Sequence, residues 1–181
     1  MEKNIYIIRH CKAKGQYPEA ELTEAGQEQA KELAAFLKDI KIERIISSPY
    51  LRAKQTIAPF AEAESIEVEI DSRLAERTLD PNAVPDWLQW MKDSFKDLEI
   101  RDVGGESGKE ATERIAGVIH DIVAGDVENT AVVTHGGMTT LLLRQYDEGI
   151  GFDQWKALSN PDVYVLTVSD EEVRYERLWK S

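Results

Sequence analysis

Residues 3–10 of the chain read KNIYIIRH, and residues 130–137 read TAVVTHGG. Both stretches contain a short apolar run, rich in β-branched side chains, that leads to a histidine, His10 in the first and His135 in the second. Such runs are typical of strands that are buried on both faces of a parallel sheet. Ligands of open α/β sheets bind at the carboxyl ends of the strands. The two stretches therefore predict one site that contains both imidazoles, with Arg9 beside the first.

The remainder of the chain alternates between strand-like and helix-like patterns. Thr23 suits the N-cap of a helix that ends near Asp39, Pro49 suits the first turn of the next helix, and Ser107 with Glu110 forms a capping box. Further strands are predicted at residues 44–47, 66–70, 163–168 and 173–178, and further helices at 48–62, 107–122 and 136–143. This alternation predicts an α/β fold with a mostly parallel central sheet, helices on both faces and a C-terminal antiparallel hairpin.

Residues 71–105 interrupt this alternation. The segment contains Asp80-Pro81, Pro85 and an amphipathic stretch at residues 87–95, and Gly104-Gly105 closes it. We expect a short insertion with one helix near the mouth of the site, packed against the domain; a lid over the site is the alternative. Because no linker or repeat divides the chain, a single domain is expected over residues 1–181.

The amino-acid composition disfavours some classes of binding partner. The 34 acidic and 22 basic residues give a formal net charge of −12, which disfavours nucleic acid and anionic membranes. A site for an anion must therefore be a local basic pocket. Cys11 is the single cysteine, which excludes an internal disulfide and fits a reducing compartment. No stretch resembles a signal peptide or a transmembrane helix, so a cytoplasmic location is expected.

Six motifs together resemble one known family. In chain order they are Arg9-His10 and the stretches at residues 22–26 (LTEAG), 47–56 (SSPYLRAKQT), 74–76 (LAE), 105–107 (GES) and 135–137 (HGG). Their order and their spread over nearly the whole chain resemble the histidine phosphatase superfamily, which includes the cofactor-dependent phosphoglycerate mutases and the acid phosphatases. The resemblance implies a phosphoglycerate mutase-like fold, with this chain in the small phosphatase branch.

The resemblance also implies a role for each of several residues. His10 corresponds to the nucleophile that accepts the phosphoryl group, and Arg9 and Arg52 correspond to the residues that clamp the phosphate. His135 corresponds to a third cationic donor. Glu76 corresponds to the proton donor for the leaving oxygen. Gly136, directly after the second histidine, offers a backbone N–H to the substrate.

Elementary chemistry supports these roles. Phosphoryl transfer depends chiefly on positioning and charge stabilisation, and the planar fork of arginine matches two phosphate oxygens. A neutral imidazole is a competent nucleophile near pH 7 when a hydrogen bond holds its other nitrogen, and a protonated His135 would donate a charge-assisted hydrogen bond. Glu106 is an alternative acid, although helix capping suits it better. His120 lacks such a context and is expected at the surface. No histidine or cysteine pair has metal-ligand spacing, so neither a metal nor another cofactor is expected.

Three positions depart from the family pattern. Cys11 stands where the family usually has glycine, and Ala13 and Gln16 stand where it has a hydroxyl residue and an asparagine. Gln16 still offers a hydrogen bond, whereas Ala13 does not. We expect Cys11 and Gln16 to contact the substrate. A cysteine-nucleophile phosphatase is excluded, because the arginine that it needs six residues after the cysteine is Tyr17 here.

Three functions compete on this pattern. The favoured one is hydrolysis of a phosphomonoester, either a small phosphorylated molecule or a phosphoprotein, through a phosphohistidine on His10. The second is a cofactor-dependent mutase, although mutases of this family are generally longer and must retain a bisphosphate. The third is a phosphate-binding regulatory module without turnover, which the departures at Cys11 and Ala13 suggest. The sequence leaves the substrate and the oligomeric state open.

Overall fold

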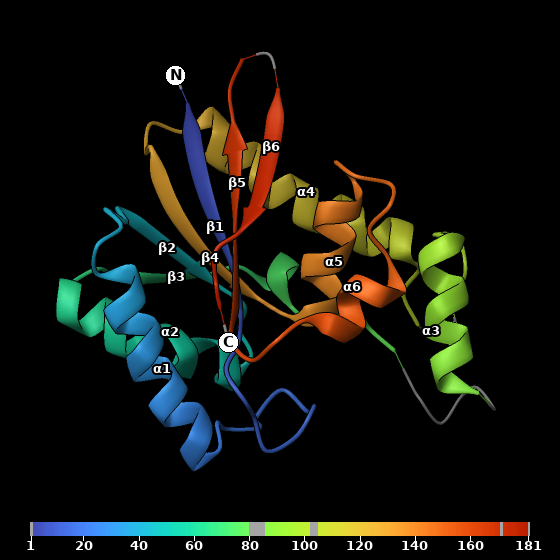
Figure 1. Ribbon diagram of the computed structural model, residues 1–181, viewed down its shortest axis with the longest axis horizontal. Helices are drawn as coiled ribbons and strands as arrows, with labels where there is room; N and C mark the ends of the chain where they lie inside the picture. Colours follow the sequence, from blue (N-terminus) through green and yellow to red (C-terminus); the bar gives the residue numbers. More distant parts are fainter. Residues whose placement is uncertain (1, 80–85, 102–104, 171, 181) are drawn as a thin grey trace.

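The computed structural model describes residues 2–79, 86–101, 105–170 and 172–180, and these build a six-stranded mixed sheet (Figure 1). The strands lie in the order β3-β2-β4-β1-β5-β6. Their bounds are β1 Lys3–Arg9, β2 Arg44–Ser47, β3 Val68–Ile70, β4 Asn129–Thr134, β5 Asp162–Val168 and β6 Val173–Arg177. The pairings among β1 to β4 are parallel, while β5 runs antiparallel to both β1 and β6. The predicted α/β class, the mostly parallel sheet and the C-terminal hairpin are confirmed.

The register of β1 and β4 determines where the site forms. Arg9 lies opposite Thr134 in this parallel pair, so the two strands end at the same level of the sheet. His10 and His135 follow directly, and the amide of His10 donates to the carbonyl of Thr134 at 3.2 Å. The prediction that both histidines lie at the same edge of the sheet is confirmed.

Side chains alternate between the two faces of the sheet, as the period of a strand requires. On one face Ile8 and Val133 pack in one buried cluster with α1 (Glu24–Leu37) and α2 (Leu51–Glu64). On the other face Ile7 and Val132 pack in a second cluster with α4 (Gly108–Ala124) and α5 (Gly136–Arg144). Figure 1 shows the two pairs of helices on opposite sides of the sheet. The predicted helices on both faces are thus confirmed.

Local capping signals predicted two of the helix starts. Thr23 caps α1, with its hydroxyl accepting from the amide of Gly26 at 2.9 Å, and Ser107 and Glu110 form the capping box of α4. The start of α2 was predicted wrongly. Helix α2 begins at Leu51 rather than at Pro49, because the amide of Ser48 still donates to the carbonyl of Val133 and so extends the pairing of β2 with β4.

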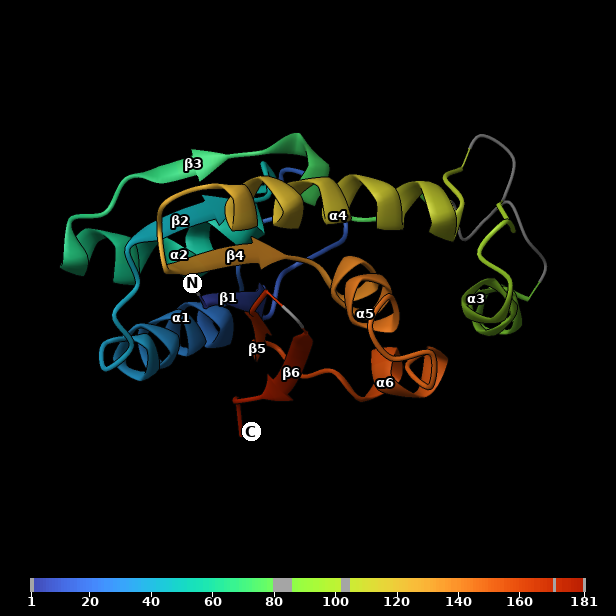
Figure 2. The same ribbon diagram turned by 90° about the horizontal axis from the view of Figure 1, so that it is seen from above.

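Helix α3 (Trp87–Lys96) is the helix of the predicted insertion, and in Figures 1 and 2 it stands apart from the sheet. It packs on α6 (Phe152–Ala157), a helix that the sequence analysis did not predict. A 3-10 turn, η1 (Ser72–Leu74), opens the segment. Asp80-Pro81, Pro85 and Gly104, which we used to mark the insertion, lie outside the described residues.

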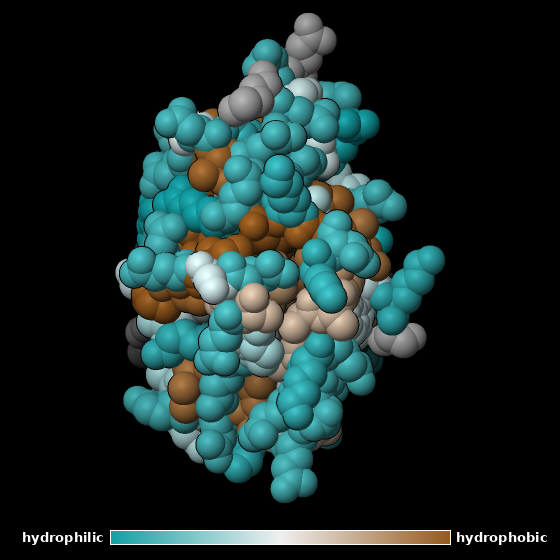
Figure 3. Space-filling view, turned by 90° about the vertical axis from the view of Figure 1, so that its left-hand side faces the viewer, coloured by the Kyte–Doolittle hydropathy of each residue, from teal (hydrophilic) through white to brown (hydrophobic). Residues whose placement is uncertain are grey.

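The face shown in Figure 3 is mostly hydrophilic, with hydrophobic residues visible in patches between the polar side chains. This agrees with the net charge of −12. Among the helices that the structure describes, none combines the length and the apolar character that crossing a membrane requires.

Candidate active site

His10 and His135 lie face to edge at the ends of β1 and β4. Their ring centroids are 5.2 Å apart, and both side chains are buried. Tyr50, the N-cap residue of α2, lies against the second ring at 4.8 Å between centroids. Three segments that are far apart in the sequence, the ends of β1 and β4 and the start of α2, thus meet at this site.

The hydrogen bonds of His10 determine its protonation state. Its Nδ1 is 2.7 Å from the backbone carbonyl oxygen of Cys11, which can only accept, so Nδ1 carries the hydrogen. Its Nε2 accepts from Nε of Arg52 at 3.3 Å. The pKa of His10 is lowered to about 3, chiefly by burial; the Cys11 carbonyl opposes this shift, and the charges of Arg52 and Arg9 add to it. His10 is therefore neutral near pH 7, with the lone pair of Nε2 directed toward the arginine.

Two guanidinium groups flank this imidazole, that of Arg52 buried and that of Arg9 half-buried. Arg52, in the first turn of α2, donates through Nη1 to the carbonyls of Gln16 and Tyr17 at 3.2 and 2.9 Å. Arg9 donates through Nη1 to the carbonyls of Leu158 and Ser159 at 3.1 and 3.3 Å. Burial lowers the pKa of both arginines, but an arginine remains charged in proteins. In the part of the chain that the structure describes, the buried Nε of Arg9 has no hydrogen-bond partner, so it is free to receive an anion.

His135 has one nitrogen bound and one unsatisfied. Its Nε2 lies 2.8 Å from the hydroxyl of Ser48, while its buried Nδ1 has no partner among the described residues. Burial lowers the pKa of His135 well below its usual value, and the positive groups around it act in the same direction. This shift favours the neutral imidazole, whereas the predicted role needs the protonated one. A bound phosphate would oppose this shift, because a nearby negative charge favours the protonated imidazole.

Glu76 is held at this site by backbone amides. The amide of Arg77 donates to its Oε1 at 2.9 Å, and the amide of Gly137, in the first turn of α5, donates to its Oε2 at 3.2 Å. A Cβ at Gly137 would lie 2.7 Å from Oε1, so only glycine allows the carboxylate to approach this closely. Gly137 was not among the predicted site residues, although it stands in the motif at residues 135–137; the second glycine of that motif is the signal.

Gly136, predicted to offer its backbone N–H to the substrate, lies against Arg9. A Cβ at Gly136 would lie 3.1 Å from Nε of Arg9, so the missing side chain makes room for the guanidinium. The residue stands at the first position of α5, where the amides of a helix N-terminus favour an anion. Gly136 thus leaves room for the guanidinium of Arg9, and it is the first residue of α5.

Arg114 and Glu106 support the turn that carries Glu76. Nε and Nη2 of Arg114 donate to the two carboxylate oxygens of Glu106 at 2.7 and 2.8 Å. The same guanidinium donates to the backbone carbonyls of Arg73, Ala75 and Glu76 at 2.7, 2.7 and 3.1 Å. Although burial raises it, the bonds from Arg114 keep the pKa of Glu106 below its usual range, so this carboxylate remains charged. Glu106 is thus a poor candidate for the acid, and Arg114 is a positioning residue that the sequence analysis missed.

The two predicted substrate contacts of the first loop differ. Gln16 lines the cavity described below. The side chain of Cys11 is fully buried in a small cluster with Leu22 and Ala30, away from that cavity, and burial raises the pKa of its thiol to about 12. The expectation that Cys11 contacts substrate through its side chain was wrong. Only its backbone acts at the site, through the carbonyl that holds His10.

A segment before β5 also supports the site without any sequence signal. The side-chain amide of Asn160 donates to the carbonyl of His10 at 3.0 Å, and the carbonyls of residues 158 and 159 hold Arg9. Asp162 is buried, accepts from the amide of Ser159 at 3.0 Å and pairs with Arg177 at 2.9 Å. His120, by contrast, has no part in the site and is 84% exposed, as expected.

These residues open into a cavity of about 470 Å³. Its polar lining includes Arg9, Arg52, Glu76, Arg77 and Gly137. Its apolar lining, called the apolar end below, consists of Leu79, Trp87, Met91, Phe95 and Trp155. His10 is not part of the lining surface, but its Nε2 is in contact with Arg52, which is. Within the described ranges, no three His, Cys, Asp or Glu side chains gather as ligands for a metal ion.

Comparison with known proteins identifies the family. The profile of the histidine phosphatase superfamily, branch 1, matches residues 5–180. The chain belongs to this superfamily. The resemblance inferred from the six motifs is therefore confirmed.

Individual relatives are distant. A protein of Hydrogenobacter thermophilus named "Putative phosphoserine phosphatase 2" is 25% identical over 151 residues, which cover 75% of this chain and 74% of that protein. The structure of a mycobacterial glucosyl-3-phosphoglycerate phosphatase is 24% identical, has a TM-score of 0.77 and covers 98% of this chain and 97% of its own. A phosphoglycerate mutase from Bacillus anthracis is 19% identical, with a TM-score of 0.74, over 98% and 92% of the two chains. The two solved structures confirm the phosphoglycerate mutase-like fold.

Proposed function

We propose that this protein hydrolyses phosphomonoesters through a phosphohistidine intermediate on His10. The observation that carries the proposal is the state of this imidazole. Its Nδ1–H is bound to the Cys11 carbonyl, its Nε2 is unprotonated, and Nε2 is in contact with the guanidinium of Arg52. A neutral, oriented imidazole beside two cations combines a nucleophile with a binding site for a phosphate.

In the first step the phosphoryl group binds between Arg9 and Arg52, with the unsatisfied Nδ1 of His135 as a further contact. Nε2 of His10 attacks the phosphorus, and the bond from phosphorus to the ester oxygen breaks. Glu76, in its protonated form, gives a proton to the leaving alkoxide, so the alcohol departs neutral. The arginines stabilise the charge that spreads over the phosphoryl oxygens in the transition state, which is the larger part of catalysis in this reaction class.

In the second step a water molecule attacks the phosphorus of the phosphohistidine. The carboxylate of Glu76 accepts a proton from this water, and the phosphorus–nitrogen bond breaks toward Nε2 of His10. Inorganic phosphate leaves, and His10 and Glu76 return to their starting protonation states. Glu76 alone thus serves both steps, because it donates a proton to the leaving alcohol in the first and accepts one from water in the second.

Hydrolysis is favoured over mutase activity by the charges around the cavity. A mutase must hold a second anionic group, but the apolar end of the cavity is lined by Leu79, Trp87, Met91, Phe95 and Trp155. Arg77 also lines the cavity, and it donates to the carbonyls of Glu106 and Ile100 and to the hydroxyl of Ser94. The name of the Hydrogenobacter relative, a phosphoserine phosphatase, supports the same reaction class.

A binding module without turnover is the weaker candidate. It was suggested by Cys11 and Ala13, which depart from the family pattern in the first loop. The buried thiol of Cys11 leaves the phosphate end of the cavity free, so this departure gives no reason for lost activity. The family relationship and the oriented imidazole both favour an active enzyme.

The test is phosphate release from p-nitrophenyl phosphate by the wild-type protein and by His10→Ala. Loss of the nucleophile should reduce kcat by at least about 10³-fold, because the alternative attack by free water lacks the oriented imidazole. His120→Ala is the matched control, since this histidine is exposed and distant from the site, and it should retain full activity. Acid-labile, alkali-stable phosphate on the quenched wild-type protein would identify phosphohistidine. Equal activity of His10→Ala and wild type would refute the proposal.

A further inference from the structure

We infer that the preferred substrate is the phosphomonoester of an uncharged alcohol that carries an apolar ring, with the ring packed against Trp87 and Trp155. The inference rests on the proposed function, because it takes the phosphate to bind at Arg9 and Arg52. What it adds is the chemistry of the leaving alcohol, which the catalytic residues alone do not determine.

The first support is the lining of the cavity beyond Glu76. Helix α3 contributes Trp87, Met91 and Phe95, and helix α6 contributes Trp155. The ring centroids of Trp87 and Trp155 are 6.0 Å apart with an interplanar angle of 64°, and those of Phe95 and Trp155 are 6.4 Å apart. This arrangement offers ring faces and edges to a ligand, which aromatic groups accept in edge-to-face or offset contact.

The second support is that Arg77, the described cation that lines the cavity besides Arg9 and Arg52, is already engaged in hydrogen bonds. The described donors of Arg77 serve the backbone of the loops and Ser94, and its guanidinium lies 5.2 Å from the ring centroid of Trp90. A carboxylate or second phosphate on the alcohol would therefore lose its hydration and meet an arginine whose described donors already serve other acceptors, which is unfavourable.

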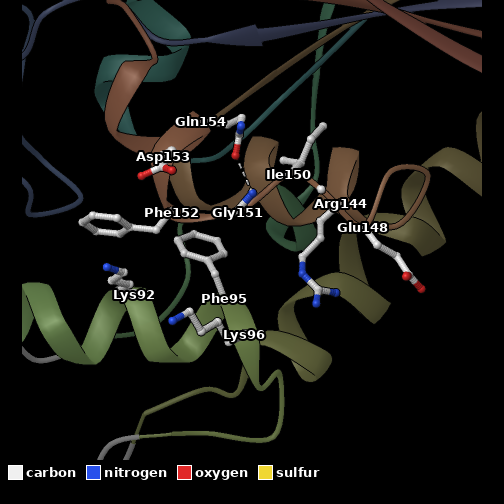
Figure 4. Close-up of a pocket in the computed structure, with 11 residues that line it drawn as sticks. Lys92, Phe95, Lys96, Arg144, Glu148, Ile150, Gly151, Phe152, Asp153 and Gln154 are labelled. Carbon is white, nitrogen blue, oxygen red and sulfur yellow. Dashed lines mark hydrogen bonds between the residues drawn. The ribbon is translucent and has the colours of Figure 1, made fainter.

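The lysines of α3 lie at a different cavity. Lys92 and Lys96 line a neighbouring space of about 390 Å³ between α3 and the α5–α6 connection, together with Arg144. Figure 4 shows these three basic side chains around Phe95 and Phe152. Phe95 lines both cavities, whereas none of the three basic residues lines the one that contains Arg9 and Arg52. The positive charge of α3 thus does not reach the alcohol end of the catalytic cavity.

The third support is an unsatisfied donor in the apolar wall. The indole Nε1 of Trp87 is buried and has no hydrogen-bond partner among the described residues. A buried donor without a partner is unfavourable, and a ligand atom that accepts from it removes this cost. An oxygen on the ring of the alcohol, such as an ether or a carbonyl, is the acceptor that the inference assigns to this position.

The experiment compares esters of primary alcohols, so that the leaving oxygens have similar basicity and differences report binding. We expect kcat/KM for 2-phenylethyl phosphate to exceed that for O-phosphoserine by about tenfold or more, with glycerol 3-phosphate nearer to O-phosphoserine. Trp87→Ala should reduce the value for the phenylethyl ester by about tenfold and leave that for glycerol 3-phosphate within about twofold. Trp87→Phe, which keeps a ring, should recover most of the loss.

Leu88→Ala is the matched control, because Leu88 neighbours Trp87 on the same helix but is 55% exposed. It should leave both esters unchanged. If O-phosphoserine is hydrolysed as well as the phenylethyl ester, or if Trp87→Ala affects all esters equally, the inference is wrong while a His10-dependent activity leaves the proposed function intact. If the folded protein hydrolyses none of the esters, the proposed function and this inference both fail.

Discussion

The substitution Gly137→Ala is predicted to lower catalytic activity while leaving the thermal stability of the protein nearly unchanged. The added Cβ would lie 2.7 Å from Oε1 of Glu76, well inside the 3.4 Å at which ordinary contact begins, so the carboxylate must retreat by about 0.7 Å. The amide of Gly137 also donates to Oε2 of Glu76, so this displacement strains the contact that orients the acid. Misplacing a catalytic group by 1 Å can cost about 10²-fold in rate. We therefore expect kcat/KM for alkyl phosphates to fall by about 10- to 100-fold.

The same substitution should not unfold the protein. Gly137 lies in the first turn of α5, and alanine in place of glycine at a compatible helical position stabilises a protein by about 0.4–1 kcal/mol. The steric clash with a movable carboxylate offsets part of this gain, so we expect a melting temperature within a few degrees of the wild type. Loss of activity would thus occur in a protein whose thermal unfolding is nearly unchanged.

The assay uses two leaving groups. An alkyl phosphate needs a proton on its departing oxygen, whereas the p-nitrophenolate ion leaves readily without one. Because kcat/KM reports only the steps up to the first irreversible one, p-nitrophenyl phosphate should lose much less than 2-phenylethyl phosphate. Gly125→Ala, at the C-cap of α4 with its added Cβ at ordinary contact distance, is the control and should leave both values unchanged. Equal losses for the two esters would refute the assignment of Glu76 as proton donor, and no loss for either would refute the steric argument.

Three further predictions address the groups around His10. Arg52→Lys should lower kcat/KM by about 10²-fold or more, because an ammonium cannot match both the imidazole contact and a phosphate oxygen; activity within threefold of wild type would contradict this. Asp162→Asn should destabilise the fold by about 1–2 kcal/mol, because the hydrogen bonds to a buried carboxylate are weakened while the half-exposed Arg177 stays solvated; urea unfolding measures this. The same substitution should raise KM, because Asp162 holds the segment whose carbonyls bind Arg9, and steady-state kinetics measure this. The pKa of His10 is about 6.5 in the unfolded chain and about 3 in the folded protein, so the free energy of unfolding should fall as the pH decreases below 6.5, by about 2 kcal/mol at pH 5. The urea midpoint should therefore change less with pH for His10→Gln than for wild type.

Short-range patterns explain why much of the fold could be predicted. Apolar runs predicted β1 and β4, and the caps Thr23 and Ser107 predicted the starts of α1 and α4, because these signals act within one or two turns of the chain. The start of α2 was missed because Ser48 is engaged by β4, a contact with a residue 85 positions away. Helix α6 was missed because six residues carry too little periodicity for a prediction.

The same distinction applies to the site. His10, His135 and Arg9 follow from strand ends, and Arg52 and Glu76 follow from motifs that resemble a family. The supports of these residues come from elsewhere: Asn160 contacts His10 across 150 residues, and Arg114 reaches the turn before Glu76 across about 40. Such contacts depend on register and packing, which leave no local pattern. The lowered pKa of His135 likewise has no local pattern, because it depends on burial by the whole fold.

Cys11 shows why residue identity alone can mislead at a catalytic loop. Its position looked like a departure that would crowd the phosphate, since the family usually has glycine there. In the structure the group that acts at this position is the backbone carbonyl, which fixes the tautomer of His10, while the side chain turns away into the cluster with Leu22 and Ala30. The residue type at this position is therefore limited by the space beside α1, not by the phosphate. A backbone function of this kind tolerates any side chain that the cluster can accommodate, and it leaves no trace in the sequence.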